Sequence, residues 1–295
     1  MSPASLHMLR RSCQSGIFLL FAALPWLNAA GLHLMTGSLF ALDFFGIPFA
    51  DPASAVQAMV LGVAAGISPG WRLVAGGGLA LLLALLLGRV FCGWLCPYGL
   101  LSELAHRLSR GSRGSAARTG RERQFFASKA GIFILALVVC AVSGYSLLTL
   151  LSMPGELSLV PMRLWQGLTA MRVAEQPVAS GSLLAVTGLG LLVPAVALLA
   201  EILFGKRVWC RYICPQSVML GLAAWLLPKN WPGLRVGWNP AGCTCKGEVP
   251  CRAACSLGCE PRHKAGPSRR DCIMCGDCVK ACSRRGGALH WQWRV

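Results

Sequence analysis

The chain has 295 residues and a net charge of +17, but only 13% of its residues are charged and 55% are hydrophobic. A soluble domain of average composition carries about a quarter charged residues, so a wholly soluble globular protein is excluded and much of the chain is expected to lie in lipid. The positive charge alone would fit a nucleic acid or an anionic membrane as partner, and the apolar runs favour the membrane.

Four apolar runs are long enough to cross a bilayer, which needs about 20 residues in a helix. They cover about 15–36, 71–88, 130–152 and 181–204. The first run could be a cleavable signal peptide with Ala29-Ala30-Gly31 as processing site. It continues apolar beyond that point, so we expect an uncleaved anchor.

The segments between these runs predict loops on the outer side of the membrane. Prolines break up 37–70 and 153–180. Within the first of these segments, the apolar piece Ala53–Ile67 is too short to span and predicts an interfacial or re-entrant helix.

The lysines and arginines gather on one side of the predicted topology. Of 28 in the chain, 25 lie in the N-terminal tail, between Arg89 and Lys129, or after residue 205. The positive-inside rule therefore predicts four transmembrane helices with both termini in the cytoplasm. This asymmetry explains the basic charge without any nucleic acid. The Gly/Ser-rich centre of the cytoplasmic loop, Gly111–Gly120, is expected to be mobile.

A cysteine motif occurs twice, 118 residues apart. Arg-Val-Phe-Cys at 89–92 corresponds to Arg-Val-Trp-Cys at 207–210, and each copy continues to a Cys-Pro pair. The repeat predicts a duplicated helix pair whose thiols meet near a pseudo-twofold axis. Cysteines at i and i+4 share a helix face, and the prolines mark a helix boundary. The four candidate ligands are Cys92, Cys96, Cys210 and Cys214.

Three interpretations of these four cysteines stay open. They could hold a cluster, whose negative charge the nearby arginines would offset while lowering the thiol pKa values. They could instead form a reversible dithiol, or they could be structural cysteines packed at helix ends.

The C-terminal tail carries a more specific motif. Cys272, Cys275, Cys278 and Cys282 have the spacing Cys-x2-Cys-x2-Cys-x3-Cys, by which bacterial ferredoxins bind a cubane iron–sulfur cluster. Zinc is the alternative, but it favours two separated Cys-x2-Cys pairs. Ser283 stands where the usual motif has proline. On the predicted reducing side of the membrane, thiolates are favoured over disulfides.

A second, irregular set of cysteines precedes this motif. In two-cluster ferredoxins the fourth cysteine of each motif ligates the other cluster. We therefore expect Cys272, Cys275 and Cys278 to share one [4Fe–4S] cluster with Cys259. The second cluster would take Cys282 with Cys245, Cys251 and Cys255, and Cys243 could substitute for Cys245.

The predicted fold is a polytopic α-helical membrane protein with a small C-terminal ferredoxin-like iron–sulfur domain. The predicted boundaries are 1–216 for the four-helix membrane domain, 217–238 for an interfacial helix and linker, and 239–295 for the iron–sulfur domain. The sequence shows no residue pattern for group-transfer catalysis, so no catalytic residues are predicted.

Four spans, two Cys-x3-Cys-Pro motifs and a ferredoxin-like tail, in this order, resemble the NapH/MauN family of membrane ferredoxin-type proteins over nearly the whole chain. The irregular cysteine set and the lack of a nitrate-specific feature resemble MauN slightly more than NapH. The resemblance implies an electron-transfer protein of the bacterial inner membrane. It would connect the quinone pool with a periplasmic oxidoreductase system for methylamine utilisation or nitrate reduction.

The same resemblance implies a role as a quinol dehydrogenase subunit, with the quinone as substrate and a second iron–sulfur protein like NapG or MauM as partner. Two rival functions belong to other classes. A metal-reducing assembly or maturation factor is disfavoured because no Met-rich or His-rich tract occurs. A membrane redox sensor would need an output domain, and the sequence indicates none.

Overall fold

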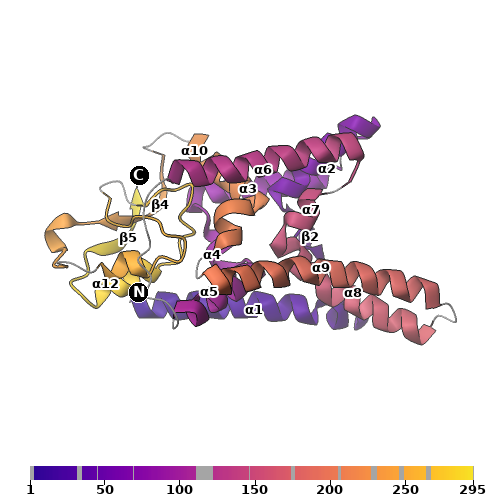
Figure 1. The fold of residues 1–295 in the computed structure, drawn as a ribbon, viewed down its shortest axis with the longest axis horizontal. Coiled ribbons are helices and arrows are strands. Elements are labelled where there is room, and N and C mark those ends of the chain that lie inside the picture. Colours follow the sequence, from indigo (N-terminus) through magenta and orange to yellow (C-terminus); the bar gives the residue numbers. More distant parts are fainter. Residues whose placement is uncertain are drawn as a thin grey trace.

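The computed structural model describes residues 3–31, 35–44, 46–68, 70–110, 122–145, 147–173, 177–204, 207–226, 231–245, 249–263 and 267–294. Long helices follow the longest axis of the molecule, and the C-terminal domain covers one end of them, beside the N-terminus (Figure 1). The segment expected to be mobile, Gly111–Gly120, lies outside the described residues.

The first helix, α1, runs over Pro3–Ala29 and so begins well before the predicted apolar run. One of its faces is buried along its middle, from Arg10 and Gln14 to Phe21 and Leu24. These positions recur at helical spacing, so they form one stripe against the rest of the protein.

The first predicted outer loop contains a small sheet and a helix. Strands β1 (Met35–Ser38), β2 (Ala41–Phe44) and β3 (Ile47–Ala50) form an antiparallel meander in that order. Helix α2 (Pro52–Ala65) follows, and the Asp51 carboxylate caps it by accepting from the Ala53 N–H at 3.0 Å. A Cβ on Gly77 would lie 2.8 Å from Ala55, so α2 packs closely on α3 (Trp71–Leu87).

The second half of the bundle differs from the prediction in two places. Helix α6 covers Glu122–Ser143 and α7 covers Leu147–Leu151, with the break at Gly144 (φ +71°). The predicted outer loop 153–180 is wrong over most of its length, because α8 covers Met153–Val173 and pairs with α9 (Pro177–Phe204). Pro154 is tolerated because the first turn of a helix lacks intrahelical N–H bonds anyway.

Among the described residues, two helices are long and apolar enough to cross a membrane, Ser5–Ala29 and Phe126–Ser143, and the four predicted spans are not all matched by helices of this kind. Shorter apolar helices cover Pro52–Ala65, Trp71–Leu87 and Gly190–Phe204 in the part of the chain that is described. Large apolar side chains on the outside of α6, including Leu135 and Val142, are exposed in the free protein. A membrane protein presents such a surface to lipid.

The remaining elements surround the cysteine segments. The short helices α4 (Val90–Trp94) and η1 (Trp209–Ile213) lead into α5 (Pro97–Arg110) and α10 (Pro215–Leu226), respectively. Helix α10 contacts α2, α3 and α6, so the structure places it within the bundle.

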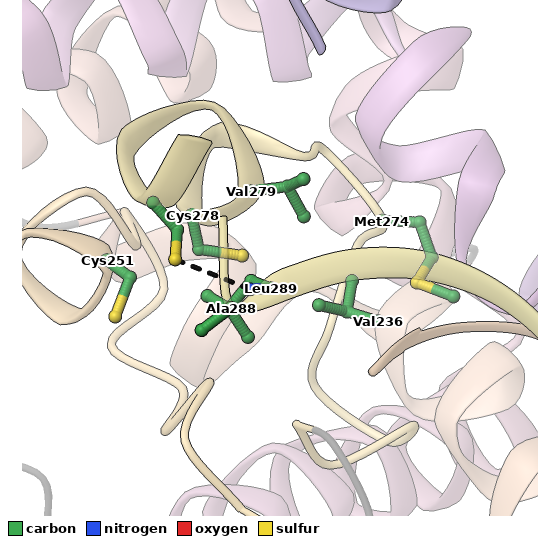
Figure 2. Packing of buried hydrophobic residues seen from close by; sticks show 8 residues of the cluster. Val236, Cys251, Met274, Cys278, Val279, Ala288 and Leu289 are labelled. Atoms are coloured by element: carbon green, nitrogen blue, oxygen red, sulfur yellow. Dashed lines mark hydrogen bonds between the residues drawn. The ribbon is translucent and has the colours of Figure 1, made fainter. Parts of the chain in front are cut away.

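The tail domain is built on a two-stranded sheet. Strand β4 (Gly233–Trp238) pairs antiparallel with β5 (Leu289–Arg294), which brings the two ends of the domain together. The short helices η2 (Pro240–Gly242), α11 (Pro250–Ala253) and α12 (Asp277–Ser283) lie between the strands in sequence. Figure 2 shows the core of this domain, where Cys251 and Cys278 lie beside Val279, Ala288 and Leu289.

Candidate iron–sulfur centres

The two copies of the cysteine motif share one local geometry. In each, a short helical turn closes with a bond from the second cysteine to a carbonyl five residues earlier. The Cys96 N–H donates to the Phe91 carbonyl at 2.9 Å, and the Cys214 N–H donates to the Trp209 carbonyl at 3.0 Å. This wider π-type turn replaces the continuous helix that the i, i+4 argument assumed. It ends where proline begins the next helix, since a residue before proline avoids the helical region.

Each cysteine of the motif has a donor in the same relative position. The Gly99 N–H donates to Cys96 Sγ at 3.3 Å, and the Ser217 N–H donates to Cys214. The Arg89 guanidinium lies 4.0 Å from Cys92 Sγ, and that of Arg207 lies 3.8 Å from Cys210 Sγ. The sequence repeat is therefore also a repeat of the hydrogen bonds around the sulfurs.

The four motif thiols lie in one place. Cys92, Cys96, Cys210 and Cys214 all interact electrostatically with one another, so the two copies meet as the repeat predicted. Among the described residues, no three Cys, His, Asp or Glu side chains are close enough to hold a single metal ion.

Buried positive charge surrounds these thiols. Arg89 and Arg207 are each only 2% exposed, and Arg89 Nε has no hydrogen-bond partner in the described structure. A buried cation needs a compensating negative charge. An anionic iron–sulfur cluster on four thiolates would supply this negative charge, so the buried arginines and the four cysteines fit such a cluster.

The tail cysteines line a separate cavity of about 400 Å³. Its walls are almost wholly apolar apart from sulfur. Two residues with positive φ, Met274 (+54°) and Gly276 (+76°), bend the loop that contains three of the cysteines. The cysteines of the cavity are Cys255, Cys259, Cys272, Cys275 and Cys278. A sulfur-lined, water-poor space of this kind fits a [4Fe–4S] cluster.

The remaining tail cysteines lie on the other side of the loop. Cys251 and Cys282 pack with Cys278 in the domain core, and the partly buried Cys243 packs against this core. The Leu289 N–H donates to Cys282 Sγ at 3.3 Å. Cys255, which the exchange argument assigned to this second group, lies instead on the cavity beside Cys259, whose N–H donates to its Sγ at 3.3 Å.

The thiols of the tail differ in acidity. The Cys259 thiol and nearby backbone N–H groups hydrogen-bond to Cys255 and lower its pKa. Burial raises the pKa of Cys272 to about 12 and that of Cys251 to about 11. Cys255 is thus the thiol best prepared to bind metal as a thiolate, whereas the other two must release protons on binding.

The loop that carries the ferredoxin motif is docked on the first motif copy. Arg89 donates to the Arg270 carbonyl at 2.7 Å, and Trp94 Nε1 donates to the Met274 carbonyl at 3.0 Å. Gly93 lies so close to the loop that a Cβ there would be 2.2 Å from the Ile273 carbonyl oxygen. Sequence reasoning did not identify these docking residues; the only signal was the glycine inside the Cys-x3-Cys motif.

This docking joins the two sets of cysteines. Cys92 and Cys210 pack against Leu257, Cys259 and Ile273, in the same cluster of side chains as Cys255 and Cys275. The first cysteine of each motif copy therefore contacts residues in the wall of the tail cavity, while Cys96 and Cys214 are buried in a core with Tyr98 and Trp209, against which Cys210 also packs.

Comparison with known proteins agrees with this arrangement. The family described as "4Fe-4S binding domain" matches residues 69–115 and again residues 187–233, once for each motif copy. Ferredoxin-type protein NapH of Escherichia coli is 24% identical over 97% of this chain and 89% of its own length. The chain is therefore similar to a NapH ferredoxin-type protein along nearly its whole length, and it carries the 4Fe-4S binding domain match twice.

Other relatives cover less of their own length. Methylamine utilization ferredoxin-type protein MauN of Methylorubrum extorquens is 26% identical over 72% of this chain and 64% of its own length. Protein NirI of Paracoccus denitrificans is 29% identical over 64% of this chain, but the match spans only 24% of NirI. No solved structure matches the chain.

Two features of the chain follow from the comparisons. The matched segments lie 118 residues apart, the same interval as the cysteine repeat, so the duplication extends over the helices on both sides of each motif. NapH matches more of the chain and MauN is slightly more identical, so the chain is not clearly more similar to one of these two proteins than to the other.

Proposed function

We propose that the protein is an integral membrane electron carrier that passes single electrons between a quinone and a partner redox protein through iron–sulfur clusters. The observation that carries this proposal is the contact of Cys92 and Cys210 with the wall of the tail cysteine cavity. Two sulfur-rich sites in contact give electrons a short path, and no described group at the interface suggests acid–base or nucleophilic catalysis.

The proposal assigns the ligands as the motifs indicate. By motif spacing, one tail cluster would take Cys272, Cys275, Cys278 and Cys259, and the other would take Cys282 with Cys245 or Cys243, Cys251 and Cys255. In the structure Cys255 lines the cavity of the first set, so it is also a candidate ligand there. The paired motif would hold a further centre on Cys92, Cys96, Cys210 and Cys214. The clusters supply one-electron redox chemistry when bound. The chain itself supplies burial, cations and N–H donors that tune their potentials.

An apolar cavity beside the paired motif supports a quinone as electron donor or acceptor. It has about 450 Å³ of space and is lined by apolar residues of β3, α3, α4 and α10, including Phe49, Phe91 and Leu220. Gln216, 3% exposed, is its single polar residue and follows Cys214 by two positions. A quinone combines an apolar body with ring oxygens that one amide can recognise.

The proposed topology has four transmembrane helices and cytoplasmic termini in the bacterial inner membrane. The charge asymmetry of the sequence supports this orientation. The domain at 239–295 would then lie on the cytoplasmic side, joined through 217–238 to the membrane domain at 1–216. The partner of the whole protein would be a second ferredoxin-type protein of the NapG or MauM kind.

Anaerobic purification in detergent tests the proposal directly. We expect about eight iron and eight sulfide per chain from two tail clusters, more if the paired motif is loaded, and cluster EPR signals after reduction. A colourless protein with stoichiometric zinc would contradict electron transfer.

A reduced quinone analogue tests the donor. It should bleach the cluster absorbance, and Gln216→Leu should raise the quinol concentration needed while leaving the iron content unchanged. Gln166→Leu, at an exposed position of α8, is the matched control. A loaded protein that no quinol reduces would instead support the assembly or sensing roles.

A further inference from the structure

Two polar side chains are buried near the start of α1. Arg10 is 1% exposed and Gln14 is 2% exposed. They are four residues apart and so lie on one face of the helix. Buried polar groups are costly unless they are hydrogen-bonded, so their partners indicate what this end of the helix does.

Arg10 connects the helix bundle to the ferredoxin loop. Its Nη1 and Nη2 donate to the two carboxylate oxygens of Glu103, each at 3.0 Å, and Nη2 also donates to Asp277 Oδ1 at 3.1 Å. Glu103 lies on α5, and Asp277 lies between Cys275 and Cys278 in the loop. Charge-assisted bonds to a fixed guanidinium fork have defined directions, so they hold the loop at one position.

Gln14 holds the other cysteine segment. Its Nε2 donates to the Gly93 carbonyl at 2.8 Å, and Gly93 lies between Cys92 and Cys96. Gly93 is also the residue that abuts the Ile273 carbonyl of the ferredoxin loop. One turn of α1 therefore contacts both cysteine segments.

We propose that this turn of α1 is a clasp that sets the distance between the paired-cysteine centre and the tail cluster, with Arg10 and Gln14 as its positioning residues. The inference rests on the proposed electron-transfer function. In the step concerned, one electron leaves the reduced centre and enters the oxidised one, and no bond forms or breaks. The rate of such a step falls steeply with distance, so a small displacement of the loop slows it.

The neighbouring residue Arg11 is a matched control. It also donates to Glu103 and, at 3.4 Å, to Gln14 Oε1, and it is half-buried at 23% exposure, but it makes no bond to Asp277 or to Gly93. Arg11→Gln removes a positive charge from the same helix turn and leaves the Arg10–Asp277 and Gln14–Gly93 hydrogen bonds in place. Arg10→Gln removes the bond to Asp277, and Gln14→Leu removes the bond to the Gly93 carbonyl; these two bonds are the arms of the clasp.

Hydrogen–deuterium exchange on the loaded full-length protein tests the clasp itself. In Arg10→Gln the amides of residues 270–277 should exchange about tenfold faster, as expected when one charge-assisted hydrogen bond is lost. Arg11→Gln should match the wild type. If Arg10→Gln does not fold, Asp277→Asn weakens the same arm and leaves the Arg10–Glu103 pair intact. Unchanged exchange in both Arg10→Gln and Asp277→Asn would overturn the proposal.

Low-temperature EPR tests the consequence. In the dithionite-reduced wild type, the two centres should show magnetic interaction, and this splitting should diminish in Arg10→Gln and Gln14→Leu at unchanged iron content. Equal splitting in all variants would contradict the clasp. A wild type without cluster iron would refute the electron-transfer function, while the exchange experiment on the same protein would still decide whether α1 holds the loop.

Discussion

Arg89 and Arg207 stand in the same relation to the first cysteine of their own motif, 4.0 Å and 3.8 Å from its sulfur. Their remaining bonds differ. Arg89 reaches across to the Arg270 carbonyl of the tail, whereas Arg207 donates to Ser102 and to the Gly99 carbonyl within the bundle. The duplicated arginines thus share one role at the sulfurs, and one of them has gained a second role in docking.

Removing either positive charge should lower the reduction potential of the paired-cysteine centre. A buried cation stabilises the more negative, reduced state of a cluster. We expect Arg89→Gln and Arg207→Gln to lower the midpoint potential by about 50–100 mV, equivalent to about 1–2 kcal/mol for one electron. An EPR-monitored redox titration measures this, with exposed Arg284→Gln as control. Equal potentials in all four proteins would show that the arginines do not tune a cluster.

The ferredoxin motif should be required for iron. Cys275→Ser with Cys278→Ser should remove one tail cluster, about four iron per chain, because serine is a poor ligand for this cluster type. Cys13→Ser is the control, since Cys13 lies on α1 and belongs to none of the candidate ligand sets. Iron and sulfide analysis of anaerobically purified protein gives the result. Unaltered iron in the double variant would refute the ligand assignment.

Gly93→Ala should displace the ferredoxin loop. Its Cβ would lie 2.2 Å from the Ile273 carbonyl oxygen, which is backbone and cannot rotate away. We expect faster proteolysis of the tail and a loss of about 1–3 kcal/mol in unfolding free energy, the usual cost of overpacking. Gly131→Ala on α6, with nothing within 4 Å, should be neutral or stabilising. A tail equally resistant in both variants would contradict the docking.

The metal-free protein should lose stability above pH 9. Burial raises the pKa values of Cys272 and Cys251 from the ordinary 9.0 to about 12 and about 11. Between pH 9 and those values, the unfolded chain ionises these thiols and the folded chain does not, so unfolding becomes easier as pH rises. Below pH 9 both states keep the protons, and these groups add no pH dependence.

Thermal unfolding of the chelator-treated protein across pH 8 to 11 checks this. Cys272→Ser with Cys251→Ser should make the decline shallower. Burial also raises the pKa values of Cys275 and Cys278, so these thiols keep part of the slope. A decline as steep as in the wild type would contradict the assignment to Cys272 and Cys251.

Several parts of the fold were predictable because they depend on local sequence. Helices within the four apolar runs followed from hydropathy, although the third breaks at Gly144. The boundary at each Cys-Pro pair followed from what proline forbids in the preceding residue. The meeting of the four motif cysteines followed from the repeat alone. The three-stranded sheet at Met35–Ala50 and helix α8 were missed, because their prolines and short strands locally resemble loops.

The docking contacts were missed for a different reason. Trp94 and Met274 are 180 residues apart, and Arg10 and Asp277 are 267 apart. Hydropathy and motif spacing describe residues that are near one another in sequence. They do not predict which distant carbonyl accepts a hydrogen bond from an indole N–H. The division of the tail cysteines depends on the same long-range packing, which brings Cys255 and Cys259 to the cavity lined by Cys272, Cys275 and Cys278.

The amino-acid sequence by itself determined the chemistry of this protein: fifteen cysteines, four of them at ferredoxin spacing, a duplicated motif and the segregation of its positive charges. Those properties reside in residue types and in intervals along the chain. Only the tertiary structure decided that the two sulfur-rich regions are in contact and that α1 holds them together. Such contacts arise from burying a few polar groups between segments far apart in sequence, and their energies exist only once the whole chain has packed.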